Sequence, residues 1–283
     1  MKAADFGYRR PGRLEEALRA LAEGEGGAMA LAGGQSLMPM MNFRVAAPEV
    51  LVDLGGIAEL RGIRDAGDRL VIGAMTRWAE LMASEVIAAE VPLLARALPE
   101  IAHPAIRNRG TIGGSVALAD PAAEAPAVLL ALEAEVVLQS LAGERRVAAA
   151  EFFLGHYDTA REPEELIVAL EVPKAGGLRC GFHEIGRRHG DFALAGAALA
   201  VAVAEGRMTE ARIALFGVAD RALRAGAAEA ALRGAVVGDG TALDRAVAAL
   251  GEIDFAGDIH ASAEMRRHLA GVALRRAWAE AVQ

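Results

Sequence analysis

The sequence contains little cysteine, lysine and serine, and each shortage excludes a class of site. Cys180 is the one cysteine among 283 residues, so the chain forms no internal disulfide and cannot alone ligate an iron–sulfur cluster or a cysteine-bound zinc ion. Neither of its two lysines, Lys2 and Lys174, follows a glycine, which excludes a phosphate-binding P-loop. None of its five serines lies in the G-x-S-x-G motif of α/β-hydrolases. We expect Cys180 to be a buried structural residue.

Other common cofactor and metal motifs are missing as well. The nearest match to the dinucleotide fingerprint G-x-G-x-x-G is GEGGAM at 24–29, which ends in methionine and follows a helix rather than a strand. The six histidines show no repeated metal-ligand spacing, and HEIGR at 183–187 departs from the zinc motif H-E-x-x-H. The net charge of −8 disfavours binding to the phosphate backbone of nucleic acid. Independent hydrolase, kinase and metalloenzyme chemistry are therefore all disfavoured.

Size and hydrophobicity are those of a chain that buries a substantial core. The hydrophobic fraction is 54%, mostly alanine, and the length fits two or three domains. No apolar run is long enough to span a membrane. Residues 1–18 lack the apolar stretch of a signal peptide. We therefore expect a cytoplasmic protein without a membrane span.

Hydrophobic periodicity predicts mixed helices and strands in the first half of the chain. It predicts a helix at 13–23, a short buried strand at 29–34 and another strand at 49–54. The segments 60–64 and 69–74 flank the turn DAGD and predict a hairpin. Residues 76–102 read as a helix interrupted at Pro92, and the following glycine-bearing stretch to about 122 reads as an irregular loop.

The second half of the chain reads as strands followed by helices. A helix is predicted from Ala123, and strands at 135–140 and 164–173 precede a linker at 174–177. The alanine-rich stretch 193–204 fits either a strand or a helix. Beyond residue 177 the pattern is sheet first and helices after, with helices predicted at 221–234, 240–252 and 262–283.

Two glycine-rich turns share one plan. LAGGQSLMPMMNFR at 31–44 and NRGTIGGSVALADPAAEAP at 108–126 each place a glycine pair just before polar side chains. Glycines allow backbone to approach a ligand closely, and free N–H groups in such turns form anion-binding nests. Each turn alone is equally a plain structural turn. Together they predict a pyrophosphate site that needs no lysine. Glu124, which follows the second turn, is either a helix-capping residue or a carboxylate for a ribose or adenine.

These motifs resemble a known family. With EELIVALEVP at 164–173, GRRHGDFALAGAALAV at 186–201 and DIHASAEMRRHLAGVALRRA at 258–277, they look like the medium, FAD-binding subunit of the molybdenum hydroxylases. That group includes xanthine dehydrogenase, carbon monoxide dehydrogenase, and nicotine and caffeine dehydrogenases. The resemblance implies an α+β chain with the vanillyl-alcohol-oxidase-type (PCMH-type) FAD-binding fold. Two α/β lobes, at 1–56 and 57–175, would precede a C-terminal α+β domain at 176–283.

The resemblance also assigns FAD contacts residue by residue. In the two turns, the contacts fall on Leu31, Ala32, Gly33, Gly34, Gln35, Ser36, Leu37, Thr111, Gly113, Gly114 and Ser115. The pyrophosphate would lie between these turns. Ile101 and Ala102 would line the cofactor, and Ile167 would pack on its adenosine or ring. Glu124 would bind the ribose–adenine half.

The C-terminal domain would cover the isoalloxazine, with contacts from His183, Glu184 and Phe192. Relatives often carry a lysine near position 183 or 184, which this sequence lacks, leaving Arg187 and Arg188 as candidate cations near the ring. Phe192 would either stack on the ring or be an ordinary core residue.

The resemblance implies an electron-transfer subunit without catalytic or metal-binding residues of its own. A large subunit with a molybdopterin cofactor would hydroxylate the substrate, and a small subunit with two [2Fe-2S] clusters would pass electrons to FAD on this chain. A dimer of such heterotrimers is expected, and the lone cysteine agrees with clusters held elsewhere. Two alternatives remain open. One is a stand-alone flavin oxidase or reductase, with His103 as the nearby candidate for covalent attachment. The other is a scaffold subunit that has lost its flavin.

Overall fold

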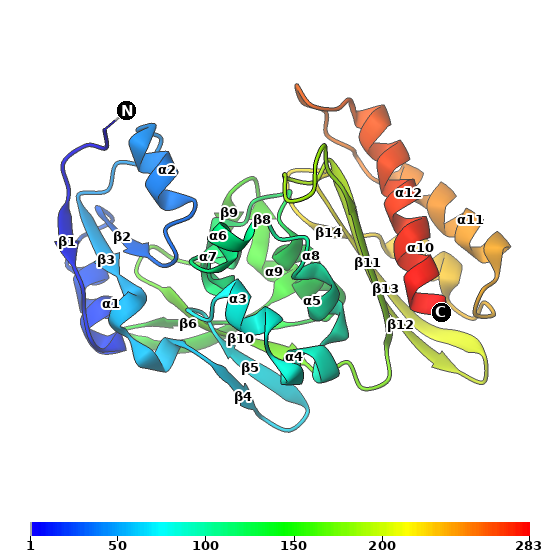
Figure 1. Cartoon of the computed structure of the whole chain (residues 1–283), viewed down its shortest axis with the longest axis horizontal. Coiled ribbons are helices and arrows are strands. Elements are labelled where there is room, and N and C mark those ends of the chain that lie inside the picture. Colours follow the sequence, from blue (N-terminus) through cyan, green and yellow to red (C-terminus); the bar gives the residue numbers. More distant parts are fainter. Residues whose placement is uncertain (1) are drawn as a thin grey trace.

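The computed structural model describes residues 2–283, which form three parts side by side along the long axis of the molecule (Figure 1). The N-terminal lobe runs from β1 to the 3-10 helix η1, the central lobe contains β4 to β10, and the C-terminal domain runs from β11 to α12. Each part contains its own β-sheet. No helix within residues 2–283 is long and apolar enough to cross a membrane.

The N-terminal lobe is a small parallel sheet with one long helix. Its strands β1 (Gly7–Arg9), β3 (Val50–Asp53) and β2 (Ala28–Leu31) pair in that order. The helix α1 (Leu14–Ala22) confirms the prediction at 13–23, and β3 confirms the strand at 49–54. The lobe also contains α2 (Leu37–Asn42) and η1 (Leu54–Gly56), and η2 (Ala58–Leu60) follows in the connection to the central lobe.

The expectation of a buried strand at 29–34 is wrong in one respect. β2 forms there, but it lies at the edge of the sheet and none of its residues is fully buried. Met29 is 40% exposed. An edge strand has a neighbour on one side alone, so its side chains receive less cover than those of the central β3.

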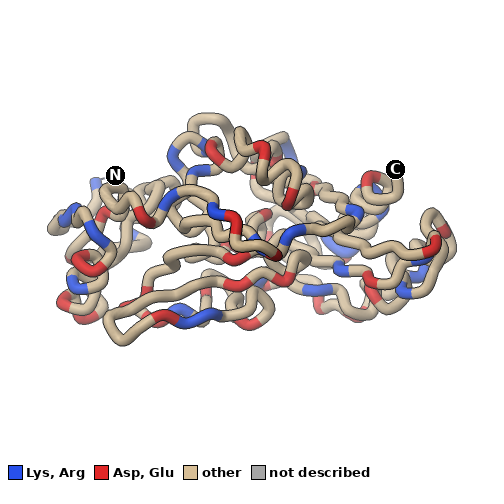
Figure 2. The backbone as a smooth tube through the Cα atoms, turned by 90° about the horizontal axis from the view of Figure 1, so that it is seen from below, with Lys and Arg blue, Asp and Glu red and all other residues tan. Residues whose placement is uncertain are grey.

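The central lobe is a five-stranded antiparallel sheet with helices packed on it. Its strands, in spatial order, are β4 (Ile63–Asp65), β5 (Arg69–Gly73), β10 (Leu166–Pro173), β6 (Glu135–Ser140) and β7 (Gly143–Ala148). The hairpin predicted around 65–68 and the strands predicted at 135–140 and 164–173 are confirmed. Acidic and basic residues are interspersed along the backbone in Figure 2. On β10, the Glu171 carboxylate accepts hydrogen bonds from the guanidinium groups of both Arg69 and Arg146.

The helices of this lobe lie between β5 and β6 along the chain, apart from α9, which follows β7. They are α3 (Trp78–Met82), α4 (Glu85–Glu90), α5 (Pro92–Ala97), α6 (Pro104–Arg107), α7 (Ile112–Leu118), α8 (Glu124–Ala131) and α9 (Ala149–Phe152). A two-stranded hairpin completes the lobe, with β8 (Phe153–Gly155) and β9 (Asp158–Thr159).

Two predictions for this region need correction. The interruption expected at Pro92 within 76–102 is confirmed, because α5 begins there, but a second break was missed: Ser84 caps α4, so the stretch forms three short helices. The stretch read as an irregular loop after residue 102 contains α6 and α7. Pro104 occupies the first turn of α6, and the Thr111 hydroxyl accepts from the Gly114 N–H at the start of α7. The helix predicted from Ala123 is confirmed as α8.

The C-terminal domain is a four-stranded antiparallel sheet with helices on both faces. The strands are β11 (Arg179–Ile185), β12 (Ala195–Ala204), β13 (Arg207–Phe216) and β14 (Leu223–Arg224). The helices α10 (Gly226–Leu232), α11 (Gly240–Ala249) and α12 (Ala263–Val282), with η3 (Leu250–Glu252), cover one face (Figure 1). α5 and α8 of the central lobe cover the other face.

This double cover explains the alanine-rich strand. The structure resolves the stretch 193–204 as β12, which lies between β11 and β13 and is buried along most of its length. The order of sheet first and helices after is thus confirmed. Cys180 on β11 is 5% exposed, and burial raises the pKa of its thiol to about 11, which confirms a buried structural cysteine.

Candidate functional site

The first glycine turn connects β2 to α2 and presents unpaired backbone donors. Gly34 has a φ of +73°, which favours glycine, and the Gln35 side-chain amide donates to the Gly33 carbonyl oxygen at 3.0 Å. The N–H groups of residues 33–36 have no hydrogen-bond acceptor within residues 2–283. A turn that leaves several successive amides free has the donor set of an anion-binding nest. This agrees with the sequence prediction for the first turn.

The second glycine turn is built differently. Gly113 donates its N–H to the Ala74 carbonyl oxygen at 2.9 Å, and the Gly114 N–H reaches the Thr111 hydroxyl at 3.2 Å. The Ser115 N–H donates to the Thr111 carbonyl oxygen at 3.2 Å. These amides are already paired inside the chain, so the expectation of a second backbone nest is wrong. This turn offers a ligand the N–H group of Thr111, which has no acceptor within residues 2–283, and the hydroxyl groups of Thr111 and Ser115.

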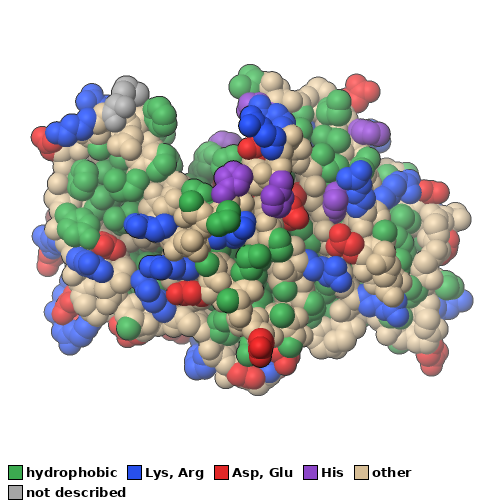
Figure 3. All heavy atoms as spheres, in the orientation of Figure 1, with side chains coloured by type: hydrophobic (Ala, Val, Ile, Leu, Met, Phe, Trp, Pro, Cys, Tyr) green, Lys and Arg blue, Asp and Glu red, His purple; other side chains and the backbone are tan. Residues whose placement is uncertain are grey.

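The two glycine turns lie against each other. A Cβ on Gly33 would overlap the carbonyl oxygen of Arg109. A Cβ on Gly114 would lie 3.4 Å from the Cβ of Ala32. Figure 3 shows the molecule hollowed between the N-terminal and central lobes, with histidine side chains on the central side of the hollow. Segments far apart in the sequence thus form one cradle of free amides and hydroxyls.

Glu124 begins α8 and its carboxyl group is buried. Burial, together with the nearby charges of Asp120 and Glu100, raises its pKa to about 7. Ile167 on β10 is 5% exposed and belongs to the central core. The register of β10 shifts against β6 just after Ile167, which breaks the regular ladder there.

Ile101 and Ala102 form a turn between α5 and α6. Ile101 is buried, and Ala102 is half-buried with a φ of +44°, a left-handed conformation that side chains with a Cβ rarely adopt. The β11–β12 loop packs against this turn. A Cβ on Gly190 would lie 2.9 Å from the Ala102 carbonyl oxygen and 2.6 Å from the His103 ring.

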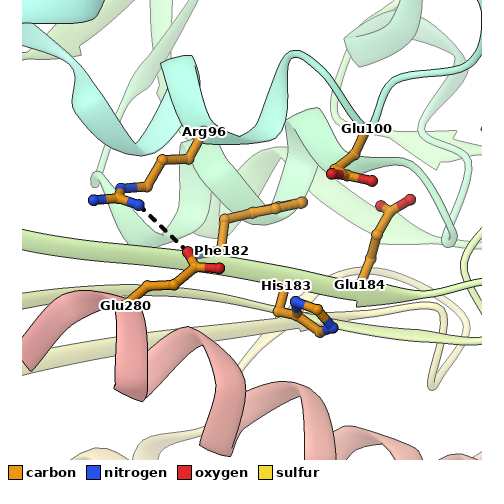
Figure 4. Close-up of a pocket in the computed structure, with 6 residues that line it drawn as sticks. All are labelled: Arg96, Glu100, Phe182, His183, Glu184 and Glu280. Carbon is orange, nitrogen blue, oxygen red and sulfur yellow. Dashed lines mark hydrogen bonds and ion pairs between the residues drawn. The ribbon is translucent and has the colours of Figure 1, made fainter. Parts of the chain in front are cut away.

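A pocket opens between the central lobe and the C-terminal domain (Figure 4). The carboxyl groups of Glu100 and Glu184 point toward one another across it. Oε2 of Glu184 is buried and has no hydrogen-bond partner within residues 2–283. Burial raises the pKa of Glu184 to about 9, and the charges of Glu124 and Glu100 add to the shift. The raised pKa favours the protonated, uncharged form of Glu184, which can donate a hydrogen bond.

His183 and Phe192 take different positions. Nε2 of His183 lies 3.0 Å from Nη1 of Arg276. Burial and the positive charge of Arg276 both lower the pKa of His183. Phe192 is 71% exposed, so the alternative that it is an ordinary core residue is wrong. It lies in the β11–β12 loop, two residues after the Gly190 that contacts Ala102 and His103.

Similarity to known proteins decides the family. The family described as FAD binding domain in molybdopterin dehydrogenase matches residues 4–175, and the CO dehydrogenase flavoprotein C-terminal domain matches residues 181–281. The chain belongs to this family of flavoproteins. It is a flavoprotein subunit of the molybdenum-containing dehydrogenases, and the resemblance stated from the motifs is confirmed.

The flavoprotein is similar to two curated relatives over nearly their whole length. It is 42% identical over 284 residues to the 6-hydroxypseudooxynicotine dehydrogenase complex subunit alpha of Paenarthrobacter nicotinovorans, covering 100% of this chain and 96% of the relative. It is 40% identical to the carbon monoxide dehydrogenase medium chain of Hydrogenophaga pseudoflava, over 96% of this chain and 95% of the relative.

Solved structures agree on the fold. A chain of carbon monoxide dehydrogenase from Hydrogenophaga pseudoflava matches with a TM-score of 0.96 at 42% identity, over 99% of this chain and 98% of that chain. A chain of quinoline 2-oxidoreductase from Pseudomonas putida 86 matches with a TM-score of 0.95 at 40% identity, over 100% and 99%. The predicted FAD-binding fold is therefore confirmed.

Sequence reasoning missed several residues that surround the site of the flavoprotein. The cation that contacts His183 is Arg276 on α12, whereas Arg188 of the predicted pair lies 3.8 Å from Asp191 and is 85% exposed. Glu100, after α5, faces Glu184. Arg107 on α6 donates to the 99–102 turn. The positions come from separate helices and no local motif marks them.

Proposed function

We propose that this chain is the FAD-binding electron-transfer subunit of a heteromeric molybdenum hydroxylase. The observation that carries the proposal is the contact between the two glycine turns, which joins free amides and hydroxyls in one cradle. Bound FAD supplies a redox group that takes up and releases electrons singly or in pairs. The role of the chain is to hold that group, set its environment and connect [2Fe-2S] clusters of a partner to an external acceptor.

The cradle fits a pyrophosphate without a lysine. In the proposal, the free N–H groups of the first turn donate to the pyrophosphate, and the second turn contributes the hydroxyl groups of Thr111 and Ser115. Lys174 is already paired with Asp65 at 2.8 Å, so it plays no part. In the proposal, the pyrophosphate contacts Ala32, Gly33, Gly34, Gln35, Ser36, Thr111, Gly113, Gly114 and Ser115. Leu31 and Leu37 flank the first turn.

The remaining proposed FAD contacts extend from the adenine end of the cofactor to the isoalloxazine ring. Glu124 binds the ribose–adenine half, which suits a carboxyl group whose pKa of about 7 leaves it both donor and acceptor. Ile101 and Ala102 line the isoalloxazine, and Ile167 packs beside the cofactor. His183, Glu184 and Phe192 approach from the C-terminal domain. An uncharged Glu184 offers a hydrogen bond where relatives often offer a lysine.

We further propose the assembly that goes with this role. A large subunit carries the molybdopterin cofactor and a small subunit carries two [2Fe-2S] clusters, in a dimer of heterotrimers in the cytoplasm. Relatives named medium chain support this assignment. One cysteine, which is buried, cannot ligate a cluster. The proposed boundaries are 1–56, 57–175 and 176–283.

Purification with and without the neighbouring gene products tests the proposal. The isolated chain should be yellow, should release FAD on acid precipitation, and should reduce an artificial acceptor only when a cluster-bearing subunit delivers electrons. FAD that stays with the precipitated protein would instead support the stand-alone enzyme with covalent attachment at His103. A chain that binds no FAD under any of these conditions would sink the proposal.

A further inference from the structure

We propose that Arg107 is a positioning residue that holds the 99–103 turn in the shape needed to line the flavin ring. The inference rests on the proposed function and adds a residue that contacts no assigned part of the cofactor. Arg107 is the last residue of α6, and its guanidinium reaches back to the turn that precedes this helix.

One guanidinium nitrogen gathers three carbonyl oxygens of the turn. Nη1 of Arg107 donates to the carbonyl oxygens of Ile101 and Ala102, at 2.8 Å each, and lies 3.3 Å from that of Pro99. Hydrogen bonds from a charged donor are stronger than neutral ones. The arrangement fixes the direction of the peptide groups that follow residues 101 and 102.

The direction of those carbonyls determines where the amides point. In a trans peptide the C=O of one residue and the N–H of the next point in opposite directions. With the carbonyl oxygens of Ile101 and Ala102 turned toward Arg107, the N–H groups of Ala102 and His103 point away from it. Neither N–H has an acceptor within residues 2–283. The turn therefore presents two unpaired donors, which suit the carbonyl oxygens and ring nitrogens of an isoalloxazine.

The turn needs such a restraint because its backbone is strained. Ala102 has a φ of +44°, where a Cβ is disfavoured, and strain of this kind persists where surrounding contacts enforce it. Arg107 enforces it from one side. Gly190 of the β11–β12 loop packs on the Ala102 carbonyl oxygen and the His103 ring, and His189 of the same loop lies 3.1 Å from Glu100.

The full chain, freed of FAD, distinguishes positioning from general structural support. ADP carries the pyrophosphate and adenosine and tests the glycine turns alone, whereas FAD also tests the ring site. Titration calorimetry would compare the two ligands for the wild type, Arg107→Ala and Arg107→Lys. Arg64→Ala is the matched control, because Arg64 is an exposed arginine on β4 of the same lobe.

We expect Arg107→Ala to weaken FAD binding about tenfold, the scale of one to two lost hydrogen bonds, and to leave ADP binding within about twofold. Iodide should quench the flavin fluorescence more strongly, and the visible circular dichroism of bound FAD should change. Arg107→Lys keeps the charge and an N–H donor group, so it should restore part of the FAD affinity. Arg64→Ala should match the wild type.

Equal losses for ADP and FAD, or an unchanged flavin spectrum in Arg107→Ala, would overturn the inference. If Arg107→Ala does not fold, the same comparison is made with Arg107→Lys, where a selective loss of FAD supports the inference and an equal loss or none contradicts it. Failure of the proposed function looks different, because the wild type itself would then bind neither ADP nor FAD.

Discussion

Gly33 and Arg109 meet through their backbones, so that a Cβ on Gly33 would occupy the place of the Arg109 carbonyl oxygen. This contact joins the N-terminal lobe to the central lobe where the two glycine turns meet. Any side chain at position 33 must push the two turns apart. The distance between the free amides of the first turn and the hydroxyl groups of the second therefore depends on glycine, which has no Cβ, at position 33.

Gly33→Val should abolish tight FAD binding. Valine separates the turns and moves the free amides of the first turn away from Thr111 and Ser115, so we expect the affinity for FAD to fall by at least about a hundredfold, or some 3 kcal/mol. The flavin-to-protein ratio after gel filtration measures this. Gly12→Ala is the control, because no atom lies within 4 Å of a Cβ there. Stoichiometric FAD in Gly33→Val would show that the turns are misassigned.

Gly113→Ala should damage the fold more than the site. A Cβ at this position would lie 2.5 Å from that of Ala74 and 2.7 Å from the Ala74 carbonyl oxygen, so α7 must move away from the central sheet. Overpacking of this kind costs about 1–3 kcal/mol of unfolding free energy. Gly114→Ala, which meets the Thr111 hydroxyl at 3.0 Å, should cost less. Denaturation of the FAD-free variants checks the order, and equal midpoints would contradict it.

Glu184 should make the FAD-free chain less stable as the pH rises. Its pKa in the folded chain is about 9, above the usual 4.5, so the folded state keeps a proton that the unfolded state has lost. The stabilisation is complete below about pH 4.5 and disappears as the pH rises through 9, with a slope of at most about 1.4 kcal/mol per pH unit.

The variant Glu184→Gln isolates this effect. Glutamine keeps a neutral hydrogen-bonding side chain, so its denaturation midpoint should vary less with pH between 5 and 9 than that of the wild type. Glu151→Gln, on the exposed side of α9, should follow the wild type. Parallel pH profiles for the wild type and Glu184→Gln would show that the Glu184 carboxyl group is not buried as described.

Arg266→Ala should destabilise the C-terminal domain severely. This buried guanidinium donates to the Leu194 carbonyl oxygen at 2.7 Å, to that of Gly217, and to the Asp258 carboxylate at 2.6 Å. Removing it leaves two carbonyl oxygens without their donor, whereas the half-exposed Asp258 carboxylate keeps the N–H groups of His260 and Ala261, so we expect a loss of about 2–4 kcal/mol in unfolding free energy. Thermal denaturation measures the loss. The exposed neighbour gives the control Arg267→Ala, and a similar melting temperature for both variants would refute the argument.

The glycine turns could be predicted from the sequence because their chemistry is local. A glycine pair followed by donors implies close approach wherever it folds, and the contact between Gly33 and Arg109 supports the pairing of the two turns. The helical state of Gly113 and Gly114 could not be predicted in this way, because glycine is a poor helix former. There the helix depends on close packing against Ala74, a tertiary contact.

The alanine-rich strand and the pocket also depend on tertiary contacts that the local sequence does not predict. Alanine favours helices locally, yet β12 is a strand because β11 and β13 pair with it on both sides. The pocket between Glu100 and Glu184 assembles side chains from the end of α5 and from β11. Its charges interact through space, so their perturbed pKa values exist only in the folded chain.

The buried position of Cys180 makes this chain a convenient frame for site-directed labelling. With 5% exposure and a pKa of about 11, its thiol is almost entirely protonated and shielded at neutral pH, and maleimides and iodoacetamides react with thiolates. A cysteine introduced on an exposed surface would therefore take nearly all of the label without prior removal of the natural thiol. One probe on α2 and a second on the β11–β12 loop would then report, as a distance, how far the N-terminal lobe and the C-terminal domain move relative to each other when a ligand binds.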